Sequence, residues 1–342
     1  MTTISANSLF STDHPHSQPL FAVSHAILSS FKQATRQYAL FHIGFCALAF
    51  LELLAFVLFF SFFTQTTLFA FSLAGLFLTG FTYFVWLFYL QAKKPQEFSD
   101  LLAQFVIRAQ SLQTHEVHSS AFLIHALYHL YSSLSKQEYT YYGIALSQPT
   151  LSPLLQKFSA WVHWKDLHKM KELILRRMVQ EHLALIREYP TDTATHLSLG
   201  ETYLLLAELY TDPHDLAQAD ALPWVSPEYQ STPFVAKKDR ALTKALEEYK
   251  ILEFYSKTNI AIYKQLARIY YDLQKPDKAI LAYETIITTH PDNEEALFDL
   301  GSLYFETGRY AQGLEVYNRL ISLHNPRAQE LLSFYDDSLE ET

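Results

Sequence analysis

Two long apolar runs lie near the start of the chain. Residues 40–63 contain a single charged residue, Glu52, and residues 68–90 contain none. Each run exceeds the roughly 20 apolar residues that a helix needs to cross a hydrocarbon core of about 30 Å. The Phe-rich runs are apolar on every helical face, whereas a helix in a soluble protein keeps a polar stripe. The pattern therefore predicts two membrane-spanning helices rather than the buried core of a soluble protein.

The connection between the runs predicts a hairpin. Only the uncharged polar residues 64–67 separate them, so the two helices must return antiparallel. Lys32 and Arg36 precede the first run, Lys93 and Lys94 follow the second, and the tip carries no positive charge. Because positive residues collect on the cytoplasmic side, both termini are expected there. We predict a mobile N-terminal segment over residues 1–38 and a transmembrane helical hairpin over residues 39–91.

Glu52 is the intramembrane polar residue of this hairpin. A carboxylate in lipid is costly unless it is protonated or paired, so such residues are often functional. Pairs of small residues four positions apart, Ala70 with Ala74 and Gly75 with Thr79, favour close helix approach on the second span. Two alternatives follow. The hairpin either serves as a simple anchor or holds a homo-oligomer together.

Nearer the C-terminus, large and small residues recur with a period of 34. The first copy contains Tyr263, Leu266, Ala267, Tyr270, Ala279, Tyr283, Ile286 and Pro291. The second contains Leu297, Leu300, Gly301, Tyr304, Gly313, Tyr317 and Leu320, and its closing Pro326 is displaced by one position. Small residues let paired helices approach closely, and the tyrosines fill the space between them.

This spacing resembles the tetratricopeptide repeat, in which a large residue, Leu-Gly and Tyr lie on one helix and Ala, an aromatic residue and Pro on the next. Tyr263 and Leu297 replace the usual Trp, and Ala267 replaces the usual Gly. A third copy has Leu199, Gly200 and Tyr203 in its first helix and Ala245, Tyr249 and Leu252 in its second. The resemblance implies an all-α fold, in which the hairpin is followed by an α-solenoid of stacked helix pairs.

The domain boundaries follow from these patterns. A helical connector, with the character of a degenerate repeat, is expected over residues 92–190, with a helix at about 117–134 pairing with a long helix at 154–189. The repeat domain is expected over residues 191–342. It contains an insertion at about 210–240, where several prolines fall, and ends in a capping helix from Ala328 to about Asp336.

The resemblance also implies a binding surface. The family holds peptides or partner helices on a concave face lined by the first helix of each pair. By that pattern the partner-binding residues are Leu197, Glu201, Lys264, Arg268, Tyr271, Phe298, Phe305 and Glu306, with Leu204, Asp272 and Ser302 beside them. Tyr271, Phe298 and Phe305 are the expected apolar anchors, unless they pack against neighbouring elements. The acidic character of the face disfavours partners that end in carboxylates and suits basic or apolar ones.

Charge and motifs exclude other classes of function. The formal net charge of −9, without a large cluster of Lys or Arg, argues against nucleic acid as a partner. His125 and His129 lie one helical turn apart, close to His115 and His118, but no carboxylate set completes a metal site. The sequence lacks a phosphate loop, a dinucleotide fingerprint and a nucleophile elbow. We predict no catalytic, cofactor-binding or metal-binding residues, no cofactor and no enzymatic activity.

These observations predict a membrane-anchored adaptor or scaffold with a protein or peptide ligand. Two settings stay open. In one, the chain lies in a bacterial inner membrane. In the other, its architecture resembles that of chlamydial inclusion membrane proteins, which carry a bilobed hydrophobic hairpin in the membrane of the pathogen's vacuole, face the host cytosol and recruit host proteins. A different hypothesis makes the hairpin itself an active oligomer that the repeats regulate.

Overall fold

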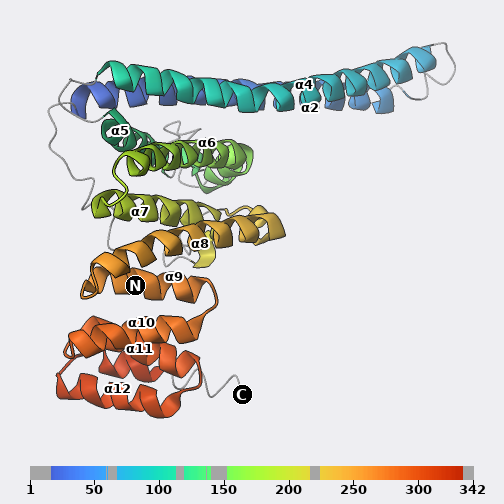
Figure 1. Ribbon diagram of the computed structural model, residues 1–342. Coiled ribbons are helices and arrows are strands. Elements are labelled where there is room, and N and C mark those ends of the chain that lie inside the picture. Colours follow the sequence, from blue (N-terminus) through green and yellow to red (C-terminus); the bar gives the residue numbers. More distant parts are fainter. Residues whose placement is uncertain are drawn as a thin grey trace. The chain divides into compact units, whose positions relative to one another are not determined.

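The computed structural model describes residues 17–58, 60, 68–112, 119–135, 137–139, 152–215 and 224–333. These residues form helices joined by turns, without a strand among them, and the prediction of an all-α fold is confirmed (Figure 1). The chain divides into two compact units. Unit 1 comprises residues 1–181 and 216–226, and unit 2 comprises residues 182–215 and 227–342.

Unit 1 contains a long antiparallel helix pair, α2 (Ser17–Leu58) and α4 (Leu68–Ser111). Hydrogen bonds between side chains join the two helices. Glu52 bonds to Thr79, His42 bonds to Tyr83, and the Tyr38 hydroxyl donates to Glu97. Partner numbers rise along α4 as they fall along α2, which is the signature of antiparallel pairing. Figure 1 shows the two helices side by side along their length.

The two halves of this helix pair differ in burial. In the half away from the tip, which we call the base (residues 17–39 and 91–111), Ile27, Phe31 and Phe105 are each at most 1% exposed. In the half near the tip, apolar side chains such as Phe71 and Phe77 are more than 70% exposed. Both helices are long and apolar enough to cross a membrane, and none of their most apolar window is buried.

The first domain boundary differs from the one predicted. The sequence pattern placed residues 1–38 in a mobile segment, but α2 begins at Ser17. The reason is that Leu20, Ile27 and Phe31 bury one face of α2 in unit 1, which makes the N-terminal turns part of a packed core. Residues 1–16, the rest of that predicted segment, lie outside the described residues.

Two further helices pack on the base. The helix α5 (Ser119–Ser133) contacts both α2 and α4, and the Ser24 hydroxyl lies 3.2 Å from Nδ1 of His129. The helix α6 (Ser152–Glu188) is joined to α4 by an ion pair of 2.7 Å between Lys94 and Asp166. A short turn, η1 (Gln137–Tyr139), is tied to α6 because the Ser159 hydroxyl donates to the carbonyl of Glu138 at 2.6 Å.

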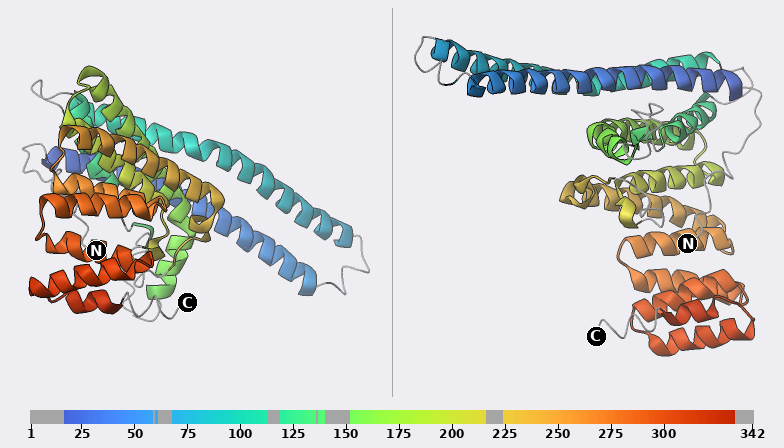
Figure 2. Two further views of the ribbon diagram at one scale, coloured as in Figure 1. Left: turned by 60° about the horizontal axis from the view of Figure 1, so that its bottom comes forward. Right: turned by 180° about the vertical axis from the view of Figure 1, so that it is seen from behind.

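Unit 2 is a stack of helix pairs (Figure 2). The first helices of the pairs are α7 (Thr193–Tyr210), α9 (Ile260–Asp272) and α11 (Glu294–Glu306). The second helices are α8 (Thr232–Tyr255), α10 (Pro276–Thr289) and α12 (Tyr310–Ser322). Each predicted set of repeat residues lies on the helix pair that the 34-residue register assigned to it.

Local sequence sets where these helices begin. Asp192, Asn259 and Asn293 are the N-caps of α7, α9 and α11, and each accepts hydrogen bonds from backbone amides of the first turn. Pro276 begins α10, where its missing N–H is not needed. Gly308, with φ at 73°, turns the chain from α11 into α12.

The insertion and the C-terminal end differ in detail from the prediction. The helix α8, which pairs with α7, begins at Thr232, because Pro233 lies in its first turn instead of in a loop. The insertion therefore occupies residues 211–231, with short helical turns η2 (Pro213–Asp215) and η4 (Pro227–Gln230). Residues 328–333 are helical, and Leu331 is fully buried in the core. Residues 334–342 lie outside the described residues.

Candidate partner-binding face

Small residues in unit 2 bring the paired helices into close contact. A Cβ atom on Gly313 would lie 2.5 Å from the Phe305 ring, and one on Gly301 would lie 2.6 Å from Leu331. A Cβ atom on Gly200 would lie 3.0 Å from the Tyr249 ring. These glycines are where the repeat pattern places them, so their role is to admit a large side chain from the neighbouring helix.

Close packing turns one set of side chains on α7, α9 and α11 outward. We call this surface the first-helix face and define it by Leu197, Glu201, Lys264, Arg268, Tyr271, Asp272, Glu295, Asp299, Ser302 and Glu306. Arg268, Tyr271, Glu295 and Glu306 are exposed, and the other members are partly exposed. Tyr271 is 41% exposed, which leaves its ring available to a partner.

Polar contacts cross the first-helix face from one repeat to the next. Lys264 on α9 forms an ion pair with Glu295 on α11. The Tyr271 hydroxyl donates to Glu306, so α9 and α11 are also joined at their C-terminal ends. The Tyr283 hydroxyl of α10 donates to Asp299 at 3.2 Å. These bonds hold adjacent helix pairs in a fixed register and orient Tyr271.

The face has a surplus of negative charge. Its five carboxyl groups, those of Glu201, Asp272, Glu295, Asp299 and Glu306, outnumber the two cations Lys264 and Arg268. Burial raises the pKa of Asp272, Asp299 and Glu306, although nearby cations or tyrosine hydroxyls oppose the increase. Raised pKa values mean that these carboxylates lack full stabilisation in the free protein. A cation brought by a partner would supply it.

Glu201 has the largest perturbation on this face. Burial raises its pKa to about 7. Its Oε2 atom is shielded from solvent and has no hydrogen-bond partner among the described residues. The neighbouring Leu197 packs partly against the core of unit 2. Both predicted residues therefore lie on the first-helix face, with Leu197 the more structural of the two.

Two of the predicted anchors are corrected by the structure. Phe305 is 0% exposed because its ring fills the space over Gly313. Phe298 is 5% exposed, and the Arg327 guanidinium lies 3.6 Å from the centre of its ring. Both rings therefore pack against neighbouring elements, which is the alternative that the sequence left open. The sequence could not separate the two cases, because anchor and core positions are both aromatic.

Glu52, the polar residue of the apolar helices, belongs to unit 1. Its Oε1 accepts a hydrogen bond of 2.9 Å from the Thr79 hydroxyl across the helix pair. Thr79 belongs to the small-residue spacing noted on the second apolar run. Glu52 thus has a partner within its own chain, and the bond fixes the register of α2 against α4 within the apolar half near the tip.

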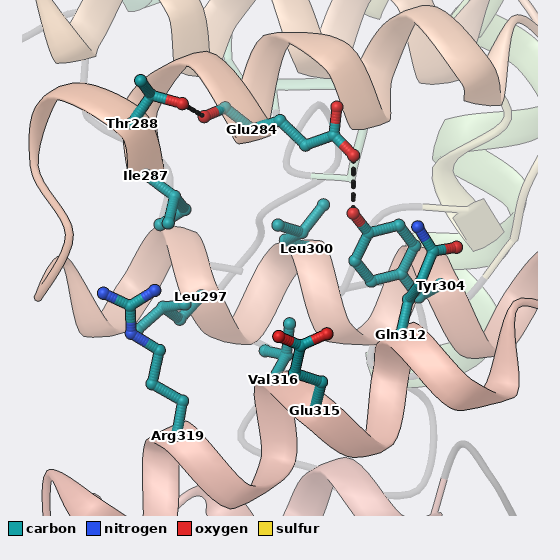
Figure 3. A pocket seen from close by; sticks show the side chains of 10 residues that line it. All are labelled: Glu284, Ile287, Thr288, Leu297, Leu300, Tyr304, Gln312, Glu315, Val316 and Arg319. Carbon is teal, nitrogen blue, oxygen red and sulfur yellow. Dashed lines mark hydrogen bonds between the residues drawn. The ribbon is translucent and has the colours of Figure 1, made fainter.

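A cavity of about 510 Å³ lies between α10, α11 and α12 (Figure 3). Its apolar lining includes Ile287, Leu297, Leu300 and Val316, and the Tyr304 hydroxyl donates to Glu284 at 2.6 Å. Glu315 and Arg319 extend into it from α12, as Figure 3 shows. The cavity shares no residue with the first-helix face, and sequence periodicity gave no signal for it.

The histidines weighed as metal ligands have other surroundings. His129 lies beside Ser24, and its ring meets Phe21 edge-on with centroids 6.2 Å apart. Within the described part of the chain, no group of three or more His, Cys, Asp or Glu is placed to hold a metal ion. His115 and His118 lie outside the described residues.

Comparison with known proteins identifies the repeats. Residues 264–328, which include α9 to α12, match the family model of the tetratricopeptide repeat. This match supports the tetratricopeptide-repeat family in the C-terminal half, as the sequence predicted. The resemblance to chlamydial inclusion membrane proteins has no support among the comparisons.

Several solved structures have low similarity to this chain. A thermophilic TPR protein of Thermus thermophilus is 17% identical, with a TM-score of 0.33. The alignment covers 64% of this chain and 98% of the Thermus chain. A MamA protein is 18% identical with a TM-score of 0.26, covering 45% and 85%. The assembly chaperone of RpL4 is 15% identical with a TM-score of 0.31, covering 72% and 97%. No curated protein matches the chain.

Proposed function

We propose that this protein is a membrane-anchored adaptor that binds a protein or peptide partner on its first-helix face. The repeat family supports the binding of proteins. The exposed apolar side chains of the α2–α4 half near the tip support anchoring, because apolar surface on this scale is stable in lipid and not in water. The four cations Lys32, Arg36, Lys93 and Lys94 flank that half and favour cytoplasmic termini.

The observation that carries the binding proposal is the exposed Tyr271 among five carboxyl groups that outnumber the two cations of the face, Lys264 and Arg268. A ring of this size supplies apolar contact area, and the surrounding negative charge selects the sign of the partner. The partner we propose is therefore a segment that combines basic and apolar side chains. A segment ending in clustered carboxylates would be repelled.

Peptide display tests this proposal. The full-length protein, held in lipid nanodiscs, selects binders from a random peptide library. We expect the selected peptides to be enriched in Lys, Arg and apolar residues. Replacing Tyr271 and Glu306 together by Ala should weaken binding by about tenfold or more, the effect of losing roughly 1.4 kcal/mol.

The matched control is Leu281→Ala. Leu281 is 62% exposed but lies on α10, a second helix, so its loss should leave peptide binding unchanged. Equal binding by the Tyr271 and Glu306 double variant and the parent would contradict the proposed face. Selection of mainly acidic peptides would contradict the proposed partner chemistry.

Anchoring and topology require a separate test. An epitope is inserted near the C-terminus. If this end faces the cytoplasm, antibody should reach the epitope only after the cells are permeabilised. Extraction of the full-length protein by alkaline carbonate would contradict anchoring. The same experiment in a bacterial host and in infected cells separates an inner-membrane protein from one that faces a host cytosol.

A hairpin-centred oligomer is the second candidate function. The observation that bears on it is the hydrogen bond between Glu52 and Thr79, which gives the carboxyl group a partner without a second chain. Glu52→Gln keeps a side chain that can bond to Thr79, so we expect no change in the detergent-resistant size of the protein. A loss of large species in that variant would favour the oligomer over the simple anchor.

A further inference from the structure

The first turns of α6 present an exposed apolar and basic stripe. Leu154, Phe158 and Trp161 are 63%, 39% and 65% exposed, and Lys165 is exposed beside them. Their spacing of four, three and four residues places them on one side of the helix. The Phe158 and Trp161 rings contact each other at a tilted angle of 40°, with their centroids 6.2 Å apart. A patch of large exposed side chains on a helix marks an interaction surface.

The opposite side of the same turns is packed. Ser159, Ala160 and His163 are 0% exposed, and Trp164 is 8% exposed. Burial lowers the pKa of His163 to about 4, with the cations Lys94 and Arg36 adding to the effect. On this buried side His163 lies near Lys94 and Arg36 of the base, and the aromatic stripe is on the other side of the helix.

The charge along this segment has a single sign. Residues 152–165 contain Lys157 and Lys165 and no Asp or Glu. Both lysines are exposed, on or next to the aromatic stripe. Helices that lie in the interface of an anionic membrane combine Trp, Phe and Leu with Lys in this way. Lysine stems cover apolar surface while their ammonium groups reach lipid headgroups.

The stripe is also joined to the apolar helices. Lys94 lies four residues after the end of the second apolar run. It forms a 2.7 Å ion pair with Asp166, which is 7% exposed. Trp161 precedes Asp166 by five residues, which is about 7.5 Å along a helix. If the apolar half near the tip is in lipid, the stripe lies close to the membrane surface.

We infer that residues 154–165 of α6 form an interfacial contact with the headgroup region of an anionic bilayer. This inference rests on the proposed membrane anchoring and adds a third membrane contact to it. Trp161 and Phe158 insert at the level of the headgroups, where aromatic side chains are favoured. Lys157 and Lys165 bind lipid phosphates, and the ion pair between Lys94 and Asp166 sets the height of the helix.

Site-specific fluorescence tests the inference on the full-length chain. Cys46 is the only cysteine, so a Cys46→Ala background accepts a single environment-sensitive dye through Trp161→Cys or, as a second position, Leu154→Cys. Lys250→Cys, at an exposed position of α8, is the matched control. The proteins are reconstituted in vesicles of phosphatidylcholine with and without phosphatidylglycerol, and carbonate extraction is measured on the same samples.

We expect the dye at position 161 or 154 to be quenched by lipid-attached nitroxide and shielded several-fold from iodide in anionic vesicles. The dye at position 250 should stay open to iodide. Lys157→Glu with Lys165→Glu should abolish the shielding, whereas Lys250→Glu with Lys257→Glu should not.

Three outcomes would overturn the inference. The first is equal iodide quenching at positions 161, 154 and 250 in a protein that resists carbonate, which leaves the anchoring intact. The second is shielding that persists in uncharged detergent and rises with protein concentration, which assigns the stripe to a second copy. The third is full extraction by carbonate, which removes the proposed anchoring and the interfacial contact with it.

Discussion

The apolar half of the α2–α4 pair and the repeat stack use the same residue types for opposite purposes. Phe77 on α4 is 73% exposed, whereas Phe305 on α11 is 0% exposed. Both lie on helices that contain Leu, Ala and Phe. In the repeat stack, Tyr249, Phe305 and Leu331 each fill the space over a glycine of a neighbouring helix. In the apolar half near the tip, side chains such as Phe71 and Phe77 are more than 70% exposed, so the surrounding medium must supply most of their contacts.

The glycines make the same comparison at single positions. A Cβ atom on Gly75 or Gly80 of α4 would find nothing within 4 Å, whereas one on Gly301 or Gly313 would overlap a buried side chain. A glycine in a helix costs about 1 kcal/mol relative to Ala, so its presence needs a reason. In the repeats the reason is the neighbouring side chain. No neighbouring side chain among the described residues accounts for Gly75 and Gly80 in the apolar half, but glycine is frequent in membrane-spanning helices.

Truncating the two phenylalanines gives the largest expected contrast. Phe305→Ala should lower the free energy of unfolding of the repeat stack by about 3–5 kcal/mol, because it leaves a cavity over Gly313. Phe77→Ala, its counterpart on α4, should leave that free energy unchanged. Amide hydrogen exchange in α11 and α12 of the full-length protein measures both. Equal protection in the two variants would contradict the packing described for Phe305.

Enlarging the two kinds of glycine gives the next contrast. Gly313→Val forces methyl groups into the Phe305 ring, and overpacking of this kind costs about 1–3 kcal/mol. Gly75→Val has open space and should not destabilise the helix pair measurably. The readout is again hydrogen exchange, in α12 for the first variant and in α4 for the second. A Gly313→Val variant as stable as the parent would contradict the close contact described between Gly313 and Phe305.

A pH-dependent difference at Glu201 is the smallest expected effect. Because burial raises its folded-state pKa to about 7, the neutral acid stabilises the fold at low pH and this contribution is lost as pH rises through 7. Glu201→Gln stays neutral, so its advantage over the parent should grow from pH 5 to pH 8. A difference in midpoint on the order of 2–4 °C is expected for a partly exposed group.

Paired thermal melts followed by circular dichroism measure this difference, with Glu247→Gln as the control at an exposed glutamate of α8. The control should show a constant difference across the same range. A constant difference for Glu201→Gln as well would show that its carboxyl group titrates in its ordinary range.

The repeat stack could be predicted closely from sequence because its signal is redundant. Spacings of three, four and 34 residues fix the helix faces, and Gly200, Gly301 and Gly313 mark the contacts between helices. The binding face was predicted less completely. Aromatic residues at equivalent positions of two repeats pack either inward, as Phe305 on α11 does, or outward, as Tyr271 on α9 does, and the choice depends on what the next helix offers.

The connector shows where single-sequence reasoning stops. The pattern suggested that the helix near residues 117–134 pairs with the long helix that follows it, but α5 contacts α2 and α4 instead. The extension of α2 back to Ser17 was missed for the same reason. Packing against elements distant in the sequence determines both features, and local periodicity carries no record of it.

The helices α2 and α4 continue from the apolar half into the base, and the structure describes α2 as unbroken from Ser17 to Leu58. In a bilayer, an unbroken helix of this length behaves as a rigid lever. A change in membrane thickness that tilts the apolar half must swing the base through the same angle. The base carries the ion pair between Lys94 and Asp166, so α6 would follow the motion. With the proposed anchoring, the mechanical state of the lipid would thereby become an input to the packed half of unit 1.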